Sequence, residues 1–230
     1  MPKVHKFILV PVAAAVAVTV ALCAGPATAR PRVPHSGGAH LVPANVIHGL
    51  TGSEMLAVGF VRDYTSQVGD PPRICPTRGR RGEILVAAPT GGTSTCTVKP
   101  GTPILILGMG NACSDVEPPP FHGDDAPAQT ACTLAFLHDF VLEIHVSVDG
   151  GTPVDIRTDR FEFLSPQITV VLPEDNIFGE PAGKTVTLVA AGWLAALRGL
   201  TPGRHTIVSE VVSSAGPFTS TLNVNFLPGA

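Results

Sequence analysis

The sequence of 230 residues predicts a mainly β protein, a sandwich or a jelly-roll-like barrel, with two helices packed against it. Three observations lead to this class. Short apolar runs recur along the chain, turn-forming Pro and Gly separate them, and apolar residues at helical spacing are confined to two stretches. We therefore expect a single β-rich domain with two helices over residues 50–227.

The first 29 residues have the parts of a secretory signal peptide. Two lysines near the start form a short basic region, residues 7–22 are an uncharged and largely apolar run, and residues 27–29 (Ala-Thr-Ala) are the small residues that a signal peptidase reads. We expect cleavage before Arg30, a secreted mature protein and no stable membrane span after cleavage.

Two other interpretations of this segment are weaker. A membrane anchor needs about 18 or more apolar residues, and the run over residues 7–22 is shorter. A lipoprotein would be attached through Cys23, but the bulky Leu22 precedes it where a small residue is expected. Both remain alternatives to cleavage.

Charge and motif content argue against some classes of function. Removal of Lys3 and Lys6 with the signal peptide takes the basic count from 15 to 13 against 18 acidic residues, a net charge of about −5 with His neutral. The sequence shows no basic patch, so nucleic acid is not an expected partner. Motifs for phosphate-binding loops, nucleophile elbows and zinc peptidases are absent from the sequence, and we expect no cofactor.

Residues 30–49 are expected to form a flexible N-terminal arm. They contain Pro31, Pro34 and Pro43, a glycine pair and little periodicity. The folded domain is therefore expected to begin near residue 50.

Two stretches are expected to be helices. The first, residues 51–67, begins with Thr51 and Glu54 at the spacing of a capping box. Its apolar residues recur at helical spacing and comprise Leu56, Ala57, Phe60, Val61 and Tyr64. The second, residues 127–142, has a proline in its first turn. His138 lies on its apolar face, where we expect a buried, hydrogen-bonded histidine rather than a ligand.

The remaining apolar segments have the length and alternation of β-strands. In chain order they are residues 83–87, 95–98, 103–107, 144–148, 154–156, 161–163, 168–172, 186–188, 205–212 and 218–226. Ile104–Leu107 is apolar on both faces, which predicts a central strand covered on both sides. The last strand alternates between apolar and polar residues, which predicts one face in contact with water, as in a sandwich.

Four cysteines follow the signal peptide, Cys75, Cys96, Cys113 and Cys132, and an even number in an exported protein predicts disulfides. Three pairings are open. We favour Cys75–Cys96 and Cys113–Cys132, because each closes a loop of about 20 residues between neighbouring elements. A metal site is the alternative, but no Cys-x-x-Cys or histidine at zinc-ligand spacing accompanies these cysteines.

Acidic side chains gather in one loop, residues 111–125. Asp115, Glu117, Asp124 and Asp125 offer the oxygen ligands that a hard cation such as calcium prefers. Their spacing matches no calcium loop, and three consecutive prolines divide the group. We expect a solvated acidic loop without a metal, with a calcium site as the alternative.

The segment Leu172–Gly183 is expected to be an ordered structural turn. Asn176 can hydrogen-bond to its own backbone, and the two glycines of the segment can adopt positive φ. Ile177 and Phe178 are apolar residues inside a polar turn, so we expect at least one of them to enter the core.

Several motifs resemble those of a family of uncharacterised secreted bacterial and archaeal proteins. Cys96-Thr-Val-Lys-Pro-Gly101, followed by an apolar strand and Asn111-Ala-Cys113, is similar to a C-T-[IV]-P-A-G-K turn before a strand that ends in Asn and Cys. Leu172-Pro-Glu-Asp-Asn-Ile177 with Gly179 and Pro181-Ala-Gly183 is similar to L-P-E-N-N-I-x-G-x-P-A-G.

Two shorter motifs extend the resemblance. Val148-Asp-Gly150 matches, and Leu200-Thr-Pro-Gly203 with His205-Thr-Ile207 is similar to P-L-S-P-G-x-H-T-I. Ala191-Gly-Trp193 departs from the family's A-D-G-Y-W, because it lacks the acid and one aromatic residue. The resemblance covers about residues 50–227 and implies an exported domain without implying a reaction.

Two classes of function follow. The favoured one is a non-catalytic extracellular binding or envelope-associated domain, whose partner would be a glycan or an envelope component. The alternative is a hydrolase or lyase that acts on an extracellular polymer, with Glu174 and Asp175 as paired carboxylates and His205 as acid or base. Convergence of these residues and the acids of 115–125 in one pocket would favour the enzyme, and dispersal would favour the binding domain.

Overall fold

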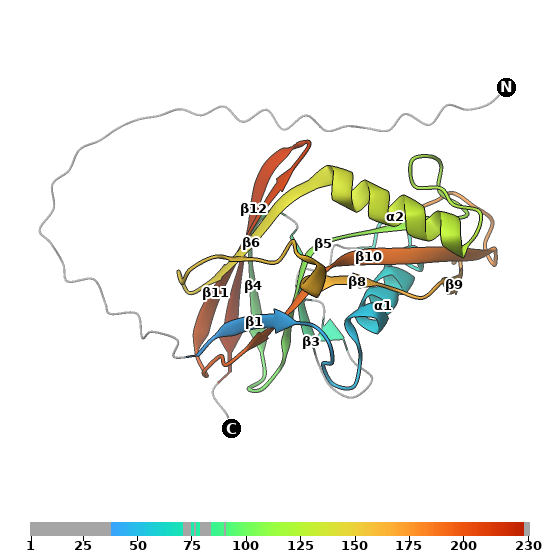
Figure 1. Cartoon of the computed structure of the whole chain (residues 1–230). Coiled ribbons are helices and arrows are strands. Elements are labelled where there is room, and N and C mark those ends of the chain that lie inside the picture. Colours follow the sequence, from blue (N-terminus) through green and yellow to red (C-terminus); the bar gives the residue numbers. More distant parts are fainter. Residues whose placement is uncertain (1–37, 71–74, 76, 79–83, 90, 228–230) are drawn as a thin grey trace, which may run out of the picture. The chain divides into compact units, whose positions relative to one another are not determined.

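The computed structural model describes residues 38–70, 75, 77–78, 84–89 and 91–227 (Figure 1). The predicted signal peptide and residues 30–37 lie outside these ranges. Within the described residues strands predominate, two α-helices are present, and two separate sheets pack face to face. The predicted β-sandwich with two packed helices is therefore confirmed, and its two sheets do not close into the barrel that was the other form of this prediction.

Each sheet draws strands from both halves of the chain. The first has the order β1 (His40–Pro43), β10 (Thr185–Arg198), β5 (Ile104–Ser114), β3 (Ile84–Ala87) and β2 (Thr77–Arg78), and β8 (Glu162–Leu164) and β9 (Ile168–Val171) also pair with β10. The second has the order β4 (Gly92–Val98), β12 (Gly216–Phe226), β11 (Arg204–Ser213), β6 (Val141–Val148) and β7 (Val154–Asp155). The sheets are referred to below as the first and second sheet.

The main core lies between the two sheets. The first sheet contributes Ile104, Ile106 and Trp193, and the second contributes side chains such as Ile144 and Val224. The final strand alternates as predicted: Leu222 and Val224 are buried, while Thr221, Asn223 and Asn225 are partly exposed. The second sheet therefore has one buried face and one face in contact with water.

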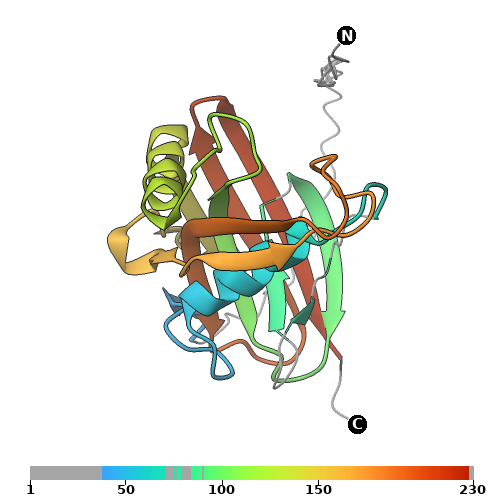
Figure 2. The same ribbon diagram turned by 90° about the vertical axis from the view of Figure 1, so that its right-hand side faces the viewer.

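Strand β10 is the longest element of the first sheet and is covered on both faces. Its even-numbered residues from 186 to 196 pack towards α1 (Gly52–Tyr64), and its odd-numbered residues from 191 to 197 face the main core. The helix α2 (Ala126–Phe140) packs on β10 and β5, and the two helices lie on opposite faces of this sheet (Figures 1 and 2). Double coverage explains why β10 is a continuous apolar run, and it confirms the prediction for Ile104–Leu107 in β5.

The two helices begin at side-chain caps. Thr51 and Glu54 form the predicted capping box, in which each side chain bonds to the other's backbone N–H. The hydrogen bond from the Thr51 backbone lowers the pKa of the Glu54 carboxyl. The first helix ends at Tyr64, earlier than predicted, and α2 spans 126–140 instead of 127–142.

The prediction of a flexible arm is wrong for its described part. Residues 40–43 form β1, which pairs with β10, and Ala44 and Ile47 are buried under α1. A four-residue strand is too short to show periodicity, and the prolines around it suggested an irregular segment. The free edge of β10 supplies the backbone partners that the local sequence could not reveal.

Candidate functional site

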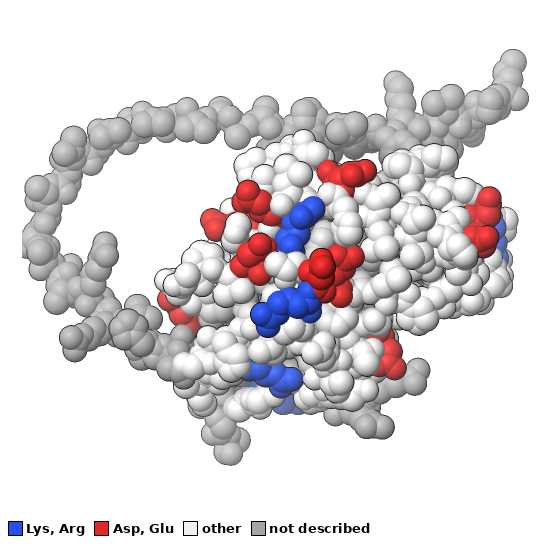
Figure 3. Space-filling model, viewed as in Figure 1, with Lys and Arg blue, Asp and Glu red and all other residues white. Residues whose placement is uncertain are grey.

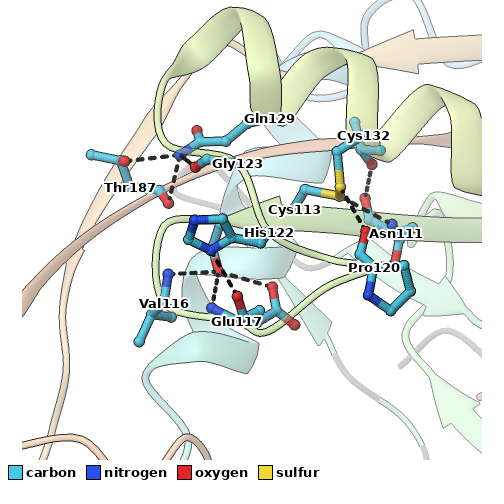
Figure 4. The surroundings of a disulfide bond; sticks show 12 residues. Asn111, Cys113, Val116, Glu117, Pro120, His122, Gly123, Gln129, Cys132 and Thr187 are labelled. Atoms are coloured by element: carbon cyan, nitrogen blue, oxygen red, sulfur yellow. Dashed lines mark hydrogen bonds between the residues drawn. A yellow bond between two sulfur atoms is a disulfide. The ribbon is translucent and has the colours of Figure 1, made fainter.

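The structure contains both favoured disulfides. Cys75 bonds to Cys96 with a Cα–Cα distance of 5.6 Å, and Cys113 bonds to Cys132 with a Cα–Cα distance of 6.1 Å. The second bridge fastens α2 to the end of β5 (Figure 4). Because a bridged sulfur carries no proton, the 3.1 Å approach of the Cys132 Sγ to the Pro120 carbonyl oxygen is a contact without a hydrogen bond.

The acidic loop after β5 is held by hydrogen bonds to its carboxylates. Asp115 accepts bonds from the backbone N–H of Thr187 (3.0 Å) and from its hydroxyl (2.9 Å), and so continues the pairing of β5 with β10. Glu117 Oε2 accepts bonds from the hydroxyls of Tyr64 and Ser114. Two of the four proposed cation ligands therefore hold structural positions inside the fold.

Burial changes the acidity of the Tyr64–Glu117 pair. Desolvation raises the pKa of the Glu117 carboxyl, and the bonds from Tyr64 and Ser114 oppose this shift in part. Desolvation, followed by the bond to Glu117, raises the pKa of the Tyr64 phenol. The phenol therefore stays protonated and acts as a donor to the carboxylate.

The other two acids of the loop have different partners. The Asp125 side chain is the N-cap of α2 and accepts a bond from the Ala128 N–H at 2.9 Å. Asp124 accepts a bond from His122 Nε2 at 2.9 Å, and His122 Nδ1 lies 2.8 Å from the Glu117 carbonyl oxygen. Both ring nitrogens face acceptors, and the bond to Asp124, followed by the bond to that carbonyl, raises the pKa of His122.

The described part of the chain holds no group of three or more His, Cys, Asp or Glu side chains that could bind a metal. The buried Gln129 closes the loop from the other side, because its Nε2 donates to Gly123 and Thr187 (Figure 4). Asp115, Glu117, Asp124 and Asp125 thus order the loop through separate hydrogen bonds instead of surrounding a common point.

The Leu172–Gly183 turn is organised around one buried side chain. Asn176, which is 3% exposed, donates through Nδ2 to the carbonyls of Pro173 (3.0 Å) and Glu180 (2.7 Å). Its Oδ1 accepts from the N–H groups of Phe178 (3.2 Å) and Glu180 (3.1 Å). Asn176 therefore bonds to its own backbone as predicted, and both glycines of the segment have positive φ.

The apolar and the acidic residues of this turn differ in their exposure to solvent. Phe178 packs on Tyr64 with a ring-centroid distance of 4.8 Å, while Ile177 is 55% exposed. Glu174 and Asp175 are exposed, and the Asp175 carbonyl accepts a bond from Val68. One apolar residue thus packs inward as expected, and the candidate carboxylates face solvent.

His205 belongs to a different site, in the second sheet. The ring is 5% exposed, with Nδ1 at 2.7 Å from Asp149 Oδ2 and Nε2 at 2.7 Å from the Thr201 carbonyl oxygen. The other Asp149 oxygen accepts a bond from the Thr206 N–H. The two ring nitrogens therefore link the turn after β6, through Asp149, to the turn before β11, through Thr201.

The candidate residues therefore do not meet in one pocket. Glu174 and Asp175 belong to the connection from β9 to β10, whereas His205 is the second residue of β11, a strand of the other sheet (Figure 1). Tyr64 links the acidic loop to the Leu172–Gly183 turn, because its hydroxyl contacts Glu117 and its ring contacts Phe178. The three residues of the alternative, catalytic interpretation therefore lie apart in the described part of the chain.

Sequence reasoning missed a polar cluster around Trp193. Arg157 lies over the Trp193 ring at 5.6 Å and donates to the carbonyls of Val141 (2.6 Å) and His138 (3.1 Å) at the end of α2. His138 stacks on the same ring and bonds to Glu162 at 3.0 Å. The side chain of His138 is 50% exposed, so its predicted burial is wrong, whereas its predicted hydrogen bonding is present.

This cluster holds the junction where α2 passes directly into β6. Arg157 satisfies carbonyls that the helix end leaves without partners, in the position where a cation is favoured by the helix dipole. Figure 3 shows acidic and basic side chains gathered on this face of the molecule. No spacing in the sequence connects Arg157 to the end of α2, so only the fold could reveal the contact.

No protein-family model, curated protein or solved structure matches the chain. The fold and the two bridges define a disulfide-bonded β-sandwich protein. In the described residues no helix is long and apolar enough to cross a membrane.

Proposed function

We propose that this chain is an exported protein that acts outside the cytoplasm as a non-catalytic binding or envelope-associated domain. The pair of disulfides is the observation that carries the proposal. Together they bond all four cysteines that follow residue 29. Stable bridges are characteristic of oxidising compartments, and the signal peptide predicted over residues 1–29 supplies the route to one.

A binding role is supported by how the candidate catalytic groups are used. His205 has both ring nitrogens engaged, and Glu117 and Asp115 each accept two bonds that position backbone or neighbouring side chains. Glu174 and Asp175 are exposed on a turn that Asn176 organises. These contacts stabilise local structure, and no arrangement of them favours the hydrolase or lyase.

Membership of the family of uncharacterised secreted proteins is part of the proposal. Its motifs include three residues that act as hydrogen-bond centres of this fold, Asp149, Asn176 and His205. Such residues are expected to be shared where a fold is shared, whatever each member binds. The motifs therefore support a common scaffold whose binding surface lies elsewhere.

Export and oxidation can be tested on the full chain expressed in a secreting bacterial host. The recovered protein should begin at or near Arg30, and a maleimide reagent should label it only after reduction. Recovery of the intact segment 1–29, or labelling of all four cysteines without reductant, would refute the proposal.

The absence of catalysis needs a separate measurement. The oxidised protein should co-sediment with a cell-envelope fraction and release no soluble fragments from it or from extracellular polysaccharides. The variants Glu174→Gln and His205→Gln provide the control. Fragment release by the wild type that Glu174→Gln abolishes, or that His205→Gln abolishes while urea unfolding shows this variant to be folded, would establish the enzyme instead.

A further inference from the structure

The outer face of the second sheet carries a regular array of neutral polar side chains. It is formed by Thr93, Thr95 and Thr97 of β4 and Thr221, Asn223 and Asn225 of β12, named here the polar ladder. The two strands are parallel, and their register places Thr93 opposite Thr221, Thr95 opposite Asn223 and Thr97 opposite Asn225. The residues between them, such as Cys96 and Val224, point into the core, so the ladder points outward.

The geometry of a sheet fixes the spacing of these groups. Neighbouring strands lie about 4.8 Å apart, and side chains on one face of a strand recur about every 6.6 Å. The three threonines of β4 are exposed, and the three ladder residues of β12 are partly exposed. The ladder is therefore a two-dimensional array of hydroxyl and amide groups in reach of a ligand.

Hydrogen bonds along the sheet orient the two amides. Asn223 Oδ1 accepts a bond from the Thr206 hydroxyl at 3.0 Å, and Asn225 Oδ1 accepts a bond from Arg204 Nε at 3.2 Å. Among the described residues nothing accepts a bond from either Nδ2. Each amide thus keeps its NH₂ group as a donor in a fixed orientation, beside hydroxyls that can donate or accept.

We propose that the polar ladder binds a neutral polysaccharide, an inference that rests on the proposed function. Sugar hydroxyls both donate and accept, and they match an array of hydroxyl and amide groups without requiring charge. On the strands beyond β12 the same face carries three acids, Glu143, Asp155 and Glu210, against one arginine, Arg204, so its net charge is negative and disfavours polyanions. The ladder also lacks the large apolar anchors that stable protein partners usually require.

The test uses the oxidised full-length protein and a panel of neutral polysaccharides, namely cellulose, chitin, dextran, mannan and galactan, with alginate as the anionic comparison. Wild-type protein should bind at least one neutral polymer and bind alginate more weakly. Asn223→Asp should weaken that binding at least tenfold, because it removes the NH₂ donor and adds a negative charge while keeping the acceptor for Thr206.

Thr169→Asp is the matched control, since it places the same charge on an exposed residue of β9 in the first sheet. It should bind like the wild type, and urea unfolding should show that both variants are folded. Failure to bind any neutral polymer, or equal binding by Asn223→Asp and the wild type, overturns the assignment of the ladder.

The same variants separate this inference from the proposed function. If Asn223→Asp still co-sediments with the envelope fraction, the assignment of the ladder as the binding surface is wrong, whereas the proposed function as a binding domain is supported. If protease treatment of the envelope abolishes co-sedimentation, the partner is a protein and the polysaccharide inference fails. If the protein is neither exported nor oxidised, the proposed function fails whatever the polymers show.

Discussion

Replacement of Asn176 by alanine is expected to destabilise the protein more than any change to the exposed acids beside it. The side chain is almost fully buried and makes four hydrogen bonds to the backbone of its own turn. Alanine removes all four bonds and leaves two carbonyls and two N–H groups without this partner. The turn also supports Phe178, which packs on Tyr64.

The magnitude follows from these bonds. A typical intramolecular hydrogen bond contributes about 0.5–1.5 kcal/mol net, so four bonds correspond to about 2–6 kcal/mol. The turn lies at the surface, and water can replace some of the lost partners. We therefore expect Asn176→Ala to lower the free energy of unfolding by about 2–4 kcal/mol.

Urea unfolding of the oxidised protein, followed by circular dichroism, measures this loss. Glu174→Gln is the control on an exposed residue of the same turn and should change stability by less than about 0.5 kcal/mol. Asn176→Asp keeps the acceptor but places a carboxylate against two carbonyl oxygens, so it should be at least as damaging as alanine at neutral pH. A loss below about 0.5 kcal/mol for Asn176→Ala would contradict the role of this side chain.

Three further predictions concern other parts of the fold. Replacing both Cys113 and Cys132 by alanine should lower the free energy of unfolding by about 3 kcal/mol, according to the chain-entropy model. Urea unfolding measures this loss, and an unchanged midpoint would show that the bridge does not stabilise the fold. The pKa of His122 should lie above 6.5 in an NMR titration and fall in Asp124→Asn. The stabilisation that protonated His122 contributes is therefore fully present below pH 6.5 and is lost as the pH rises through the raised pKa. An unchanged His122 pKa in Asp124→Asn would exclude the bond to Asp124 as the cause of the shift. Arg157→Ala should cost about 1–3 kcal/mol, because it leaves carbonyls at the end of α2 without their donor, and Arg157→Lys should restore only part of this in the same urea assay.

Local signals predicted the elements whose causes are local. The capping box of Thr51 and Glu54 starts α1, and alternation defines β12, because both depend on residues close in sequence. The disulfide pairing was favoured by loop length and is present in the structure. The Leu172–Gly183 turn could be predicted because the Asn176 side chain bonds only to residues within four positions of itself.

Contacts between distant segments were not predictable in the same way. Strand β1 exists because the edge of β10 offers backbone partners, and residues 40–43 are otherwise too few to show a pattern. The Asp149–His205 pair and the clamp of Arg157 on the end of α2 each join segments far apart in the sequence. The half-exposed position of His138 follows from where α2 meets Trp193 and Glu162.

The sequence by itself therefore determined the β-rich class, the caps and turns, the favoured disulfides and the expectation of export. These follow from spacing, turn chemistry and composition, which act over a few residues or over the whole chain. The tertiary structure alone decided which polar groups from distant segments meet. It used His205, Glu117 and Asp115 as structural partners, separated them from Glu174 and Asp175, and aligned the threonines of β4 with the polar residues of β12. The physical reason is that strand order and register are set by long-range burial and backbone pairing, and these fix which side chains share a face.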